Sequence, residues 1–147
     1  QAQSVSADST KGTSGVDSNT RARVLVVDDD PALQKLVRTL LLRGNMETIA
    51  ALDAASAAEE LRKRPLHDVV VLDMMLPDVS GLEFLRQMRA KPVFDDLPVV
   101  ILSALADPDQ IRAGLSAGAD RYLTKPYLAN NLITTLQDLI RDGRPTP

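Results

Sequence analysis

Acidic residues, a hydroxyl and an ammonium stand at the ends of four strand-like runs in this sequence. They are Asp28, Asp29 and Asp30 after residues 24–27, Asp73 after residues 69–72, Ser103 after residues 98–102, and Lys125 after residues 121–124. Runs of four or five aliphatic residues are typical of strands buried on both faces. In open parallel sheets, ligands gather beyond the carboxyl ends of the strands. We therefore expect these side chains to converge in one crevice.

Such a set of side chains suits the transfer of a phosphoryl group to an aspartate. A carboxylate can accept a phosphoryl group as an acyl phosphate if nearby charges offset its repulsion of the anionic donor. Mg²⁺ prefers oxygen ligands, keeps several waters and is commonly held by one or two carboxylates together with a phosphate. Asp28, Asp29 and Asp73 bring three negative charges, which one Mg²⁺ ion and Lys125 would offset to about zero.

Each of these residues also has a simpler structural explanation. An aspartate before a proline is often a helix N-cap, and we expect Asp30, which precedes Pro31, to be one. Asp73 could be an ordinary acid between a strand and a turn, and Ser103 an ordinary turn residue. Tyr122 could be a half-buried sheet aromatic. The occurrence of reactive residues at successive strand ends favours a shared site.

The elements that must position these residues alternate between strand-like and helix-like segments. We predict strands over residues 24–27, 47–51, 69–72, 98–102 and 121–124, and helices over residues 31–43, 54–64, 80–90, 107–118 and 128–141. This alternation is typical of βαβ units and a parallel sheet. With right-handed crossovers, such a chain forms a three-layer α/β sandwich.

The helical segments carry apolar residues at the spacing of one helix face, which we expect to point inward. These residues are Leu33, Leu36, Val37, Leu40 and Leu41 in the first helix, Leu82, Leu85 and Met88 in the third, and Leu128, Leu132, Leu136, Leu139 and Ile140 in the fifth. His67 precedes the third strand, away from the acids, and we expect it on the surface.

The length and the terminal segments predict one domain between two tails. A chain of 147 residues is long enough for a single core. Residues 1–21 are rich in Ser, Thr, Gly, Asp and Gln, which predicts a disordered tail or linker. Residues 144–147 are interpreted as a C-terminal tail or the start of a linker. The expected domain covers residues 22–143.

Composition excludes several classes of function. A net charge of −3 and a pI near 5.1 provide no electrostatic footprint for nucleic acid or an anionic membrane, so we expect no direct binding to either. Without cysteine, the chain has no disulfide, thiolate nucleophile or zinc-thiolate site. No stretch approaches the length of a membrane span and the N-terminus lacks a signal-peptide pattern. We expect a cytoplasmic protein.

Four segments together resemble the receiver domain of two-component response regulators. They are VLVVDDDP at residues 24–31, VVVLDMMLPDVSGLEFL at 69–85, VVILSA at 99–104 and GADRYLTKPY at 118–127. The resemblance extends from about Arg23 to Gly143. It implies a (βα)5 flavodoxin-like fold with a parallel five-stranded sheet of order 2-1-3-4-5. It also implies phosphorylation of an aspartate by a phosphohistidine on a sensor histidine kinase or a phosphotransfer protein.

The resemblance implies a role for each residue of the expected crevice. Asp73 matches the phosphoacceptor, and Asp29 and Asp73 would bind Mg²⁺ (or Mn²⁺) directly. The backbone carbonyl of Met75 would add a further oxygen ligand, and Asp28 would assist through water. Lys125 would pair with a phosphoryl oxygen.

The resemblance also implies a conformational switch. Ser103 matches the hydroxyl that is drawn toward the phosphoryl group, and Tyr122 matches the aromatic that turns inward in response. The surface formed by the fourth helix, the fifth strand and the fifth helix would change and could bind a second copy or a downstream effector. Pro126 matches a proline that follows a cis bond. Such a domain catalyses only its own phosphorylation and dephosphorylation.

Two alternatives remain open at this point. One is a receiver-like interaction module that is not phosphorylated, although such modules usually lack one of the catalytic residues, all of which are present here. The other is a phosphohydrolase similar to the haloacid dehalogenases, whose D-x-D spacing is matched by Asp28 and Asp30. That family expects Thr or Val where this chain has Ala32, and it would leave Asp73 without a role.

Overall fold

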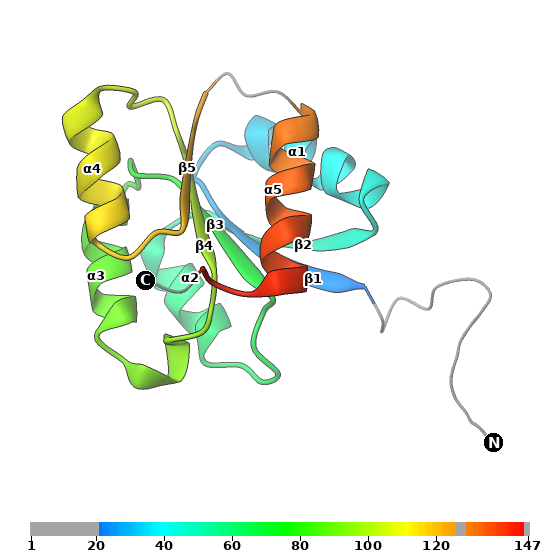
Figure 1. Ribbon diagram of the computed structural model, residues 1–147, viewed down its shortest axis with the longest axis horizontal. Coiled ribbons are helices and arrows are strands. Elements are labelled where there is room, and N and C mark those ends of the chain that lie inside the picture. The colour runs from blue at the N-terminus through cyan, green and yellow to red at the C-terminus, as the bar shows by residue number, and fades with distance from the viewer. Residues whose placement is uncertain (1–20, 126–128, 146–147) are drawn as a thin grey trace.

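The computed structural model describes residues 21–125 and 129–145, in which strands and helices alternate (Figure 1). The strands are β1 (Ala22–Val27), β2 (Met46–Ala51), β3 (Val69–Leu72), β4 (Val99–Ser103) and β5 (Arg121–Thr124). The helices are α1 (Pro31–Arg43), α2 (Ala54–Leu61), α3 (Gly81–Arg89), the 3₁₀ turn η2 (Pro92–Phe94), α4 (Pro108–Ser116) and α5 (Ala129–Asp142). The predicted alternation of strands and helices is confirmed.

Several predictions concern residues outside the described ranges. They are the N-terminal tail up to residue 20, the cis bond before Pro126, the inward position of Leu128 and the last two residues of the C-terminal tail. These stay predictions, as do the domain boundaries. Among the described residues, no helix combines the length and the apolar character that crossing a membrane requires.

The five strands form one parallel sheet in the order β2-β1-β3-β4-β5, which confirms the expected flavodoxin-like α/β fold. At the carboxyl ends, Val27 of β1 pairs with Ala51 of β2 on one side and with Leu72 of β3 on the other. The residues that follow β1 and β3 therefore leave the sheet side by side. The N–H of Asp73 donates to the carbonyl of Val27 at 3.0 Å, which continues this alignment past the strand end.

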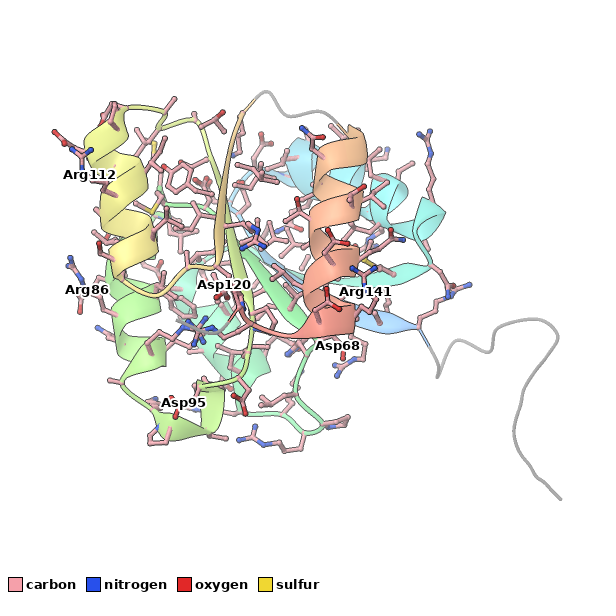
Figure 2. All side chains as sticks on the ribbon, viewed as in Figure 1. Asp68, Arg86, Asp95, Arg112, Asp120 and Arg141 are labelled. Carbon is pink, nitrogen blue, oxygen red and sulfur yellow. The ribbon has the colours of Figure 1, made fainter. Side chains whose placement is uncertain are left out.

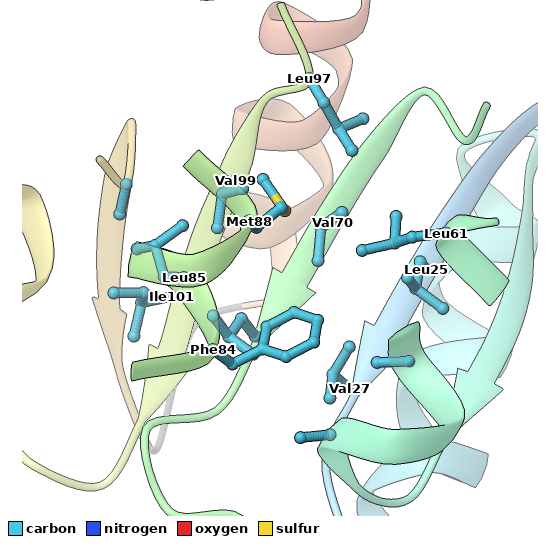
Figure 3. Packing of buried hydrophobic residues seen from close by; sticks show 14 of the residues in the cluster. Leu25, Val27, Leu61, Val70, Phe84, Leu85, Met88, Leu97, Val99 and Ile101 are labelled. Carbon is cyan, nitrogen blue, oxygen red and sulfur yellow. The ribbon is translucent and has the colours of Figure 1, made fainter. Parts of the chain in front are cut away.

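The core has two parts because alternate residues of each strand face opposite sides of the sheet. One part lies against α2 and α3 and includes Leu25 and Val27. The other lies against α1 and α5 and includes Val24 and Val26. Figure 3 shows the first part, where α3 packs its apolar face onto the sheet. The labelled α3 residues are Phe84, Leu85 and Met88, and they lie over Val70, Val99 and Ile101. Burying each such side chain contributes about 1.5–3 kcal/mol.

The ends of α1 follow from local sequence, as predicted. The side chain of Asp30 accepts a hydrogen bond from Ala32 N at 3.0 Å, and Pro31 occupies the first helical position, where its missing N–H is not needed. At the other end, Asn45 adopts a φ of 60° after the capping residue Gly44. Asp30 therefore serves as the helix cap that was expected.

The second helix ends earlier than predicted. The pattern predicted a helix to residue 64, whereas α2 ends at Leu61 with Arg62 as its C-cap. The N–H groups of Arg62 and Lys63 bond to carbonyls three residues back, at 3.2 and 3.1 Å. This tighter pattern is common in a last helical turn.

The inward face of α1 differs from the predicted stripe at one position. Leu36 is 51% exposed, while Gln34 is buried in the face that packs on the sheet. Its side-chain amide donates to the carbonyls of Val26, Asp28 and Ala51, at 2.9, 3.1 and 3.2 Å. These carbonyls lie where β1 and β2 end, and the amide of Gln34 gives them a hydrogen-bond donor that a leucine could not supply.

The prediction of a surface position for His67 is wrong, because its side chain is buried. It lies just before β3, and its Nε2 is 3.5 Å from Oε1 of Glu60 in α2. Burial, with a smaller effect from the charge of Arg23, lowers the pKa of His67 below its usual value despite the nearby Glu60. The imidazole is therefore held in its neutral form.

Candidate functional site

Three carboxylates gather at the carboxyl ends of β1 and β3. One oxygen each from Asp28, Asp29 and Asp73 lies within 4.8 Å of the other two. Asp28 and Asp73 are buried, whereas Asp29 is exposed. We call these three residues the acidic cluster. The parallel register of β1 and β3 brings them together, as the sequence predicted.

Lys125 brings one positive charge to the acidic cluster from the end of β5. Its Nζ lies 2.9 Å from Oδ2 of Asp28 and 3.5 Å from Oδ2 of Asp73. The backbone N–H of Lys125 donates to the carbonyl of Ser103 at 2.8 Å, which fixes the start of the side chain beside β4. Burial alone would lower the pKa of Lys125, but the bond to Asp28 and the charge of Asp73 outweigh burial and raise it.

The environment of Asp73 disfavours its charged form. Burial is the largest cause that raises the pKa of Asp73, and the neighbouring charge of Asp28 raises it further. A hydrogen bond of 3.2 Å from Met75 N to Oδ1, together with Lys125, acts in the opposite direction without cancelling the effect. The site therefore carries more negative charge than its single ammonium offsets.

This donor set fits a small divalent cation. Carboxylate oxygens are hard ligands, and an octahedral Mg²⁺ site with bonds of about 2.0–2.1 Å places opposite ligands about 4.2 Å apart. The oxygens of the acidic cluster, within 4.8 Å of one another, are close to that spacing. A divalent ion would balance the two negative charges left after Lys125 is counted.

The loop after Asp73 depends on a glycine that sequence reasoning did not single out. The N–H of Gly81 donates to the carbonyl of Met74 at 2.9 Å, which closes the loop at the start of α3. A Cβ at position 81 would lie 2.0 Å from the carbonyl oxygen of Asp73. Any larger residue would therefore push the loop away from the acidic cluster. The motif contained the signal, because Gly81 lies inside the segment that resembled the family.

The side chains of Ser103 and Tyr122 meet the same loop from different strands. Ser103 is fully buried at the end of β4, and its Oγ accepts a hydrogen bond from Leu105 N at 3.3 Å. The hydroxyl of Tyr122, in β5, donates to the carbonyl of Leu105 at 2.6 Å. The tyrosine ring packs beside Gly114 of α4, where an added Cβ would lie 3.1 Å from it. Burial raises the pKa of Tyr122, so its hydroxyl remains a donor at neutral pH.

The chain matches known proteins over most of its length. The family model of the response regulator receiver domain matches residues 24–137. The response regulator MprA of Mycobacterium leprae is 40% identical over 124 residues, which are 84% of this chain and 53% of that protein. The phosphate regulon transcriptional regulatory protein PhoB of Escherichia coli is 33% identical over 123 residues, with the same two shares. The chain thus spans about half the length of these curated relatives.

Solved structures show the same architecture. The receiver domain of the Francisella response regulator 1452 aligns with a TM-score of 0.76 and 33% identity, covering 82% of this chain and 98% of that one. The BeF3-activated receiver domain of DrrB aligns with a TM-score of 0.74 and 30% identity, covering 83% and 99%.

Proposed function

This chain belongs to the family of response regulator receiver domains, and on that basis we propose that it accepts a phosphoryl group on Asp73. A receiver domain is a signalling module of two-component systems and not an enzyme acting on separate substrates, so the phosphohydrolase alternative is wrong. The observation that carries the proposal is the position of Asp73, which shares a site with two further carboxylates and the ammonium of Lys125.

The proposed reaction forms one bond and breaks one bond. A carboxylate oxygen of Asp73 attacks the phosphorus of a phosphohistidine on a sensor kinase or phosphotransfer protein. The P–N bond breaks as the O–P bond forms, and the imidazole nitrogen leaves with its electron pair. The raised pKa of Asp73 makes nearby positive charge important, because only the ionised carboxylate can attack.

The remaining residues of the site would neutralise and orient the phosphoryl group. Asp29 and Asp73 would hold Mg²⁺ (or Mn²⁺) directly, Asp28 would act through water, and the carbonyl of Met75 would supply a backbone oxygen. When bound, the ion would offset negative charge on the acceptor and the phosphoryl oxygens. Lys125, which now pairs with Asp28 and Asp73, would exchange one of these contacts for a phosphoryl oxygen.

The hydrogen bonds around Leu105 support a switch that runs from Ser103 to Tyr122. If the hydroxyl of Ser103 turns toward the phosphoryl group, Leu105 N loses its acceptor and the loop after β4 shifts. The carbonyl of Leu105 then no longer holds the hydroxyl of Tyr122 in place. Movement of the ring next to Gly114 would change the surface of α4, β5 and α5.

The partners that follow are a histidine kinase or phosphotransfer protein on the input side. On the output side, a second copy of the chain or an effector would bind the surface of α4, β5 and α5. We propose a cytoplasmic protein with no direct contact to nucleic acid or membrane, because its net charge of −3 does not favour either surface. The name of PhoB describes a transcriptional regulator, which makes control of transcription a proposal for the output.

The first test is intact-mass spectrometry after incubation with acetyl phosphate and Mg²⁺. We expect the mass of one added phosphoryl group, which should be lost in Asp73→Asn and when Mg²⁺ is omitted. A folded protein that neither binds Mg²⁺ nor gains mass would support the interaction-module alternative. Phosphorylation that persists in Asp73→Asn would place the acceptor elsewhere.

A further inference from the structure

The loop between β3 and α3 is tied to the N-terminus of α2 by the carboxylate of Asp78. Oδ1 of Asp78 accepts from Ala54 N at 2.9 Å, and Oδ2 accepts from Ala55 N at 3.0 Å. Oδ1 also accepts from Val79 N at 3.0 Å. The bond from Ala54, followed by those from Ala55 and from the loop, lowers the pKa of Asp78, so the carboxylate is ionised in these contacts at neutral pH.

Two aspartates, Asp53 and Asp78, accept hydrogen bonds from the first N–H groups of α2. The N-cap Asp53 accepts from Ser56 N at 2.8 Å, as the sequence around a helix start favours. The first N–H groups of a helix have no partner within it. The groups of Ala54 and Ala55 find theirs in Asp78, which is 24 residues from Ala54 along the chain. Two aspartates thus cap one helix end, but only Asp78 joins it to another loop.

The contact between Asp78 and α2 passes the end of β1, which two members of the acidic cluster follow. In the sheet, β1 lies between β2 and β3, and α2 follows β2 while the loop of Asp78 follows β3. The bond between Asp78 and α2 therefore connects the loops on both flanks of β1, at the edge where Asp28 and Asp29 stand.

The same loop carries the proposed phosphoacceptor and the backbone oxygen proposed as a metal ligand. Its first part is held by the buried side chain of Met74 and by the hydrogen bond from Gly81 N to Met74 O. Met75 follows with a side chain that is 57% exposed, so packing does little to hold it. Asp78 supplies the anchor on the far side of Met75.

We propose that Asp78 is a positioning residue for metal binding and phosphorylation, acting by fixing the loop that carries Asp73 and Met75 to α2. The inference rests on the proposed function. Mg²⁺ demands near-ideal octahedral geometry, so a small displacement of one oxygen weakens binding. Groups that orient metal ligands without touching the metal typically change metal affinity by tenfold or more when removed. Asp78 is not one of the residues proposed to hold the metal or the phosphoryl group.

The matched pair of variants is Asp78→Ala and Asp53→Ala. Both remove a carboxylate that caps the same end of α2, but only Asp78→Ala releases the loop after β3. Mg²⁺ affinity is measured by calorimetric titration, and phosphorylation by intact mass with acetyl phosphate at low and at saturating Mg²⁺. Urea unfolding of each variant reports the loss of stability separately.

We expect Asp78→Ala to weaken Mg²⁺ binding about tenfold. Its phosphorylation should be slowed mainly at low Mg²⁺ and should recover at saturating Mg²⁺. Asp53→Ala should keep the Mg²⁺ affinity of the unchanged protein, even if it loses a similar amount of stability. Asp78→Asn keeps one acceptor oxygen and should give an intermediate affinity, and it replaces Asp78→Ala if that variant does not fold.

Equal Mg²⁺ affinity in Asp78→Ala and the unchanged protein would overturn the inference, as would an equal loss in Asp78→Ala and Asp53→Ala. Both results leave the proposed function intact, provided that the unchanged protein binds Mg²⁺ and becomes phosphorylated. If the unchanged protein does neither, the proposed function fails first, and the role of Asp78 fails with it.

Discussion

Two clusters of charged side chains lie at opposite ends of the strands of the same sheet. Only in one of them do groups of the protein itself satisfy the charged side chains. The acidic cluster, with Lys125, stands at the carboxyl ends of the strands. The second, which we call the arginine cluster, consists of Asp120, Arg89 and Arg144 near the amino ends of β4 and β5. Asp120 is labelled in Figure 2.

The arginine cluster is closed by hydrogen bonds within the protein. Oδ1 of Asp120 accepts from Arg144 at 2.9 Å, and Oδ2 accepts from Arg89 at 3.4 Å and from Val99 N at 2.9 Å. Further guanidinium N–H groups reach backbone carbonyls, which are those of Phe94, Asp95 and Gly118. Burial and the charge of Arg144 lower the pKa of Arg89 to about 10, which still leaves it charged at neutral pH.

The comparison shows that an excess of charge alone does not identify a ligand site. Two guanidiniums face one carboxylate at the arginine cluster. The guanidinium N–H groups that do not bond to this carboxylate donate to backbone carbonyl oxygens instead. At the acidic cluster, three carboxylates face one ammonium, and within the described ranges Lys125 is the only cation that pairs with them. Two backbone N–H groups also donate to this cluster, those of Asp30 and Met75, but they carry no net charge, so the negative charge that remains can be balanced by a cation from solution. The arginine cluster therefore stabilises the fold, whereas the acidic cluster fits the proposed metal site.

Removal of the carboxylate at the arginine cluster should have the largest effect on stability. Asp120→Ala would remove the carboxylate that pairs with two partly buried guanidiniums, and breaking a buried pair in this way costs about 3–5 kcal/mol. Urea unfolding measures the loss. The control is Asp142→Ala, which removes an exposed partner of Arg141 and should change stability little, because an exposed ion pair is screened by solvent. A similar small loss in both variants would mean that the arginine cluster is not closed as described.

Mg²⁺ should stabilise the protein through the acidic cluster alone. A ligand that binds only the folded state at a concentration of one hundred times its Kd adds about 2.7 kcal/mol. We expect thermal unfolding to shift upward with Mg²⁺ in the unchanged protein, and to stop responding in Asp29→Asn. Arg144→Gln, at the other edge, should keep the full response. A shift that survives in Asp29→Asn would show that the ion binds elsewhere.

Without metal, neutralising the acidic cluster should stabilise the fold. Burial and the charge of Asp28 raise the pKa of Asp73, so its stabilising contribution is present at acidic pH and is lost as pH rises through the folded-state pKa. At neutral pH, Asp73→Asn should therefore gain about 0.5–2 kcal/mol in EDTA, a range common for single stabilising changes. The gain in urea unfolding should shrink at pH 4. A loss of stability at pH 7 would show that the ion pair with Lys125 outweighs burial.

Replacing His67, a buried ionisable residue outside both clusters, should have the smallest effect on the unfolding free energy. Because burial lowers its pKa, the unfolded chain takes up a proton more readily than the folded protein. Its contribution to stability is present above the unfolded pKa of about 6.5 and is lost as pH falls toward the folded value. The unfolding free energy at pH 5.5 and pH 7.5 should differ less in His67→Gln than in the unchanged protein. Equal differences would exclude this role.

The sequence alone was sufficient to predict the strands and the residues of the acidic cluster. The order of the strands in the sheet was predicted from the resemblance to the family. Apolar runs mark buried strands through a local period, and parallel strands all present their carboxyl ends to one edge. Asp28, Asp29, Asp73 and Lys125 could therefore be placed together from their positions after such runs. The helix cap at Asp30 was equally local, since it needs only the two residues that follow.

Only the tertiary structure decided the roles of residues whose partners are distant in the sequence. Gln34 is buried on the inner face of α1, where its amide meets three carbonyls at the ends of β1 and β2, while Leu36 is exposed. His67 is buried beside α2, and Asp78 caps that helix from another loop. Asp120 accepts hydrogen bonds from Arg89 and Arg144, which are 31 and 24 residues away along the chain. No local period encodes such contacts, because they depend on how the layers pack and on which backbone groups packing leaves without partners.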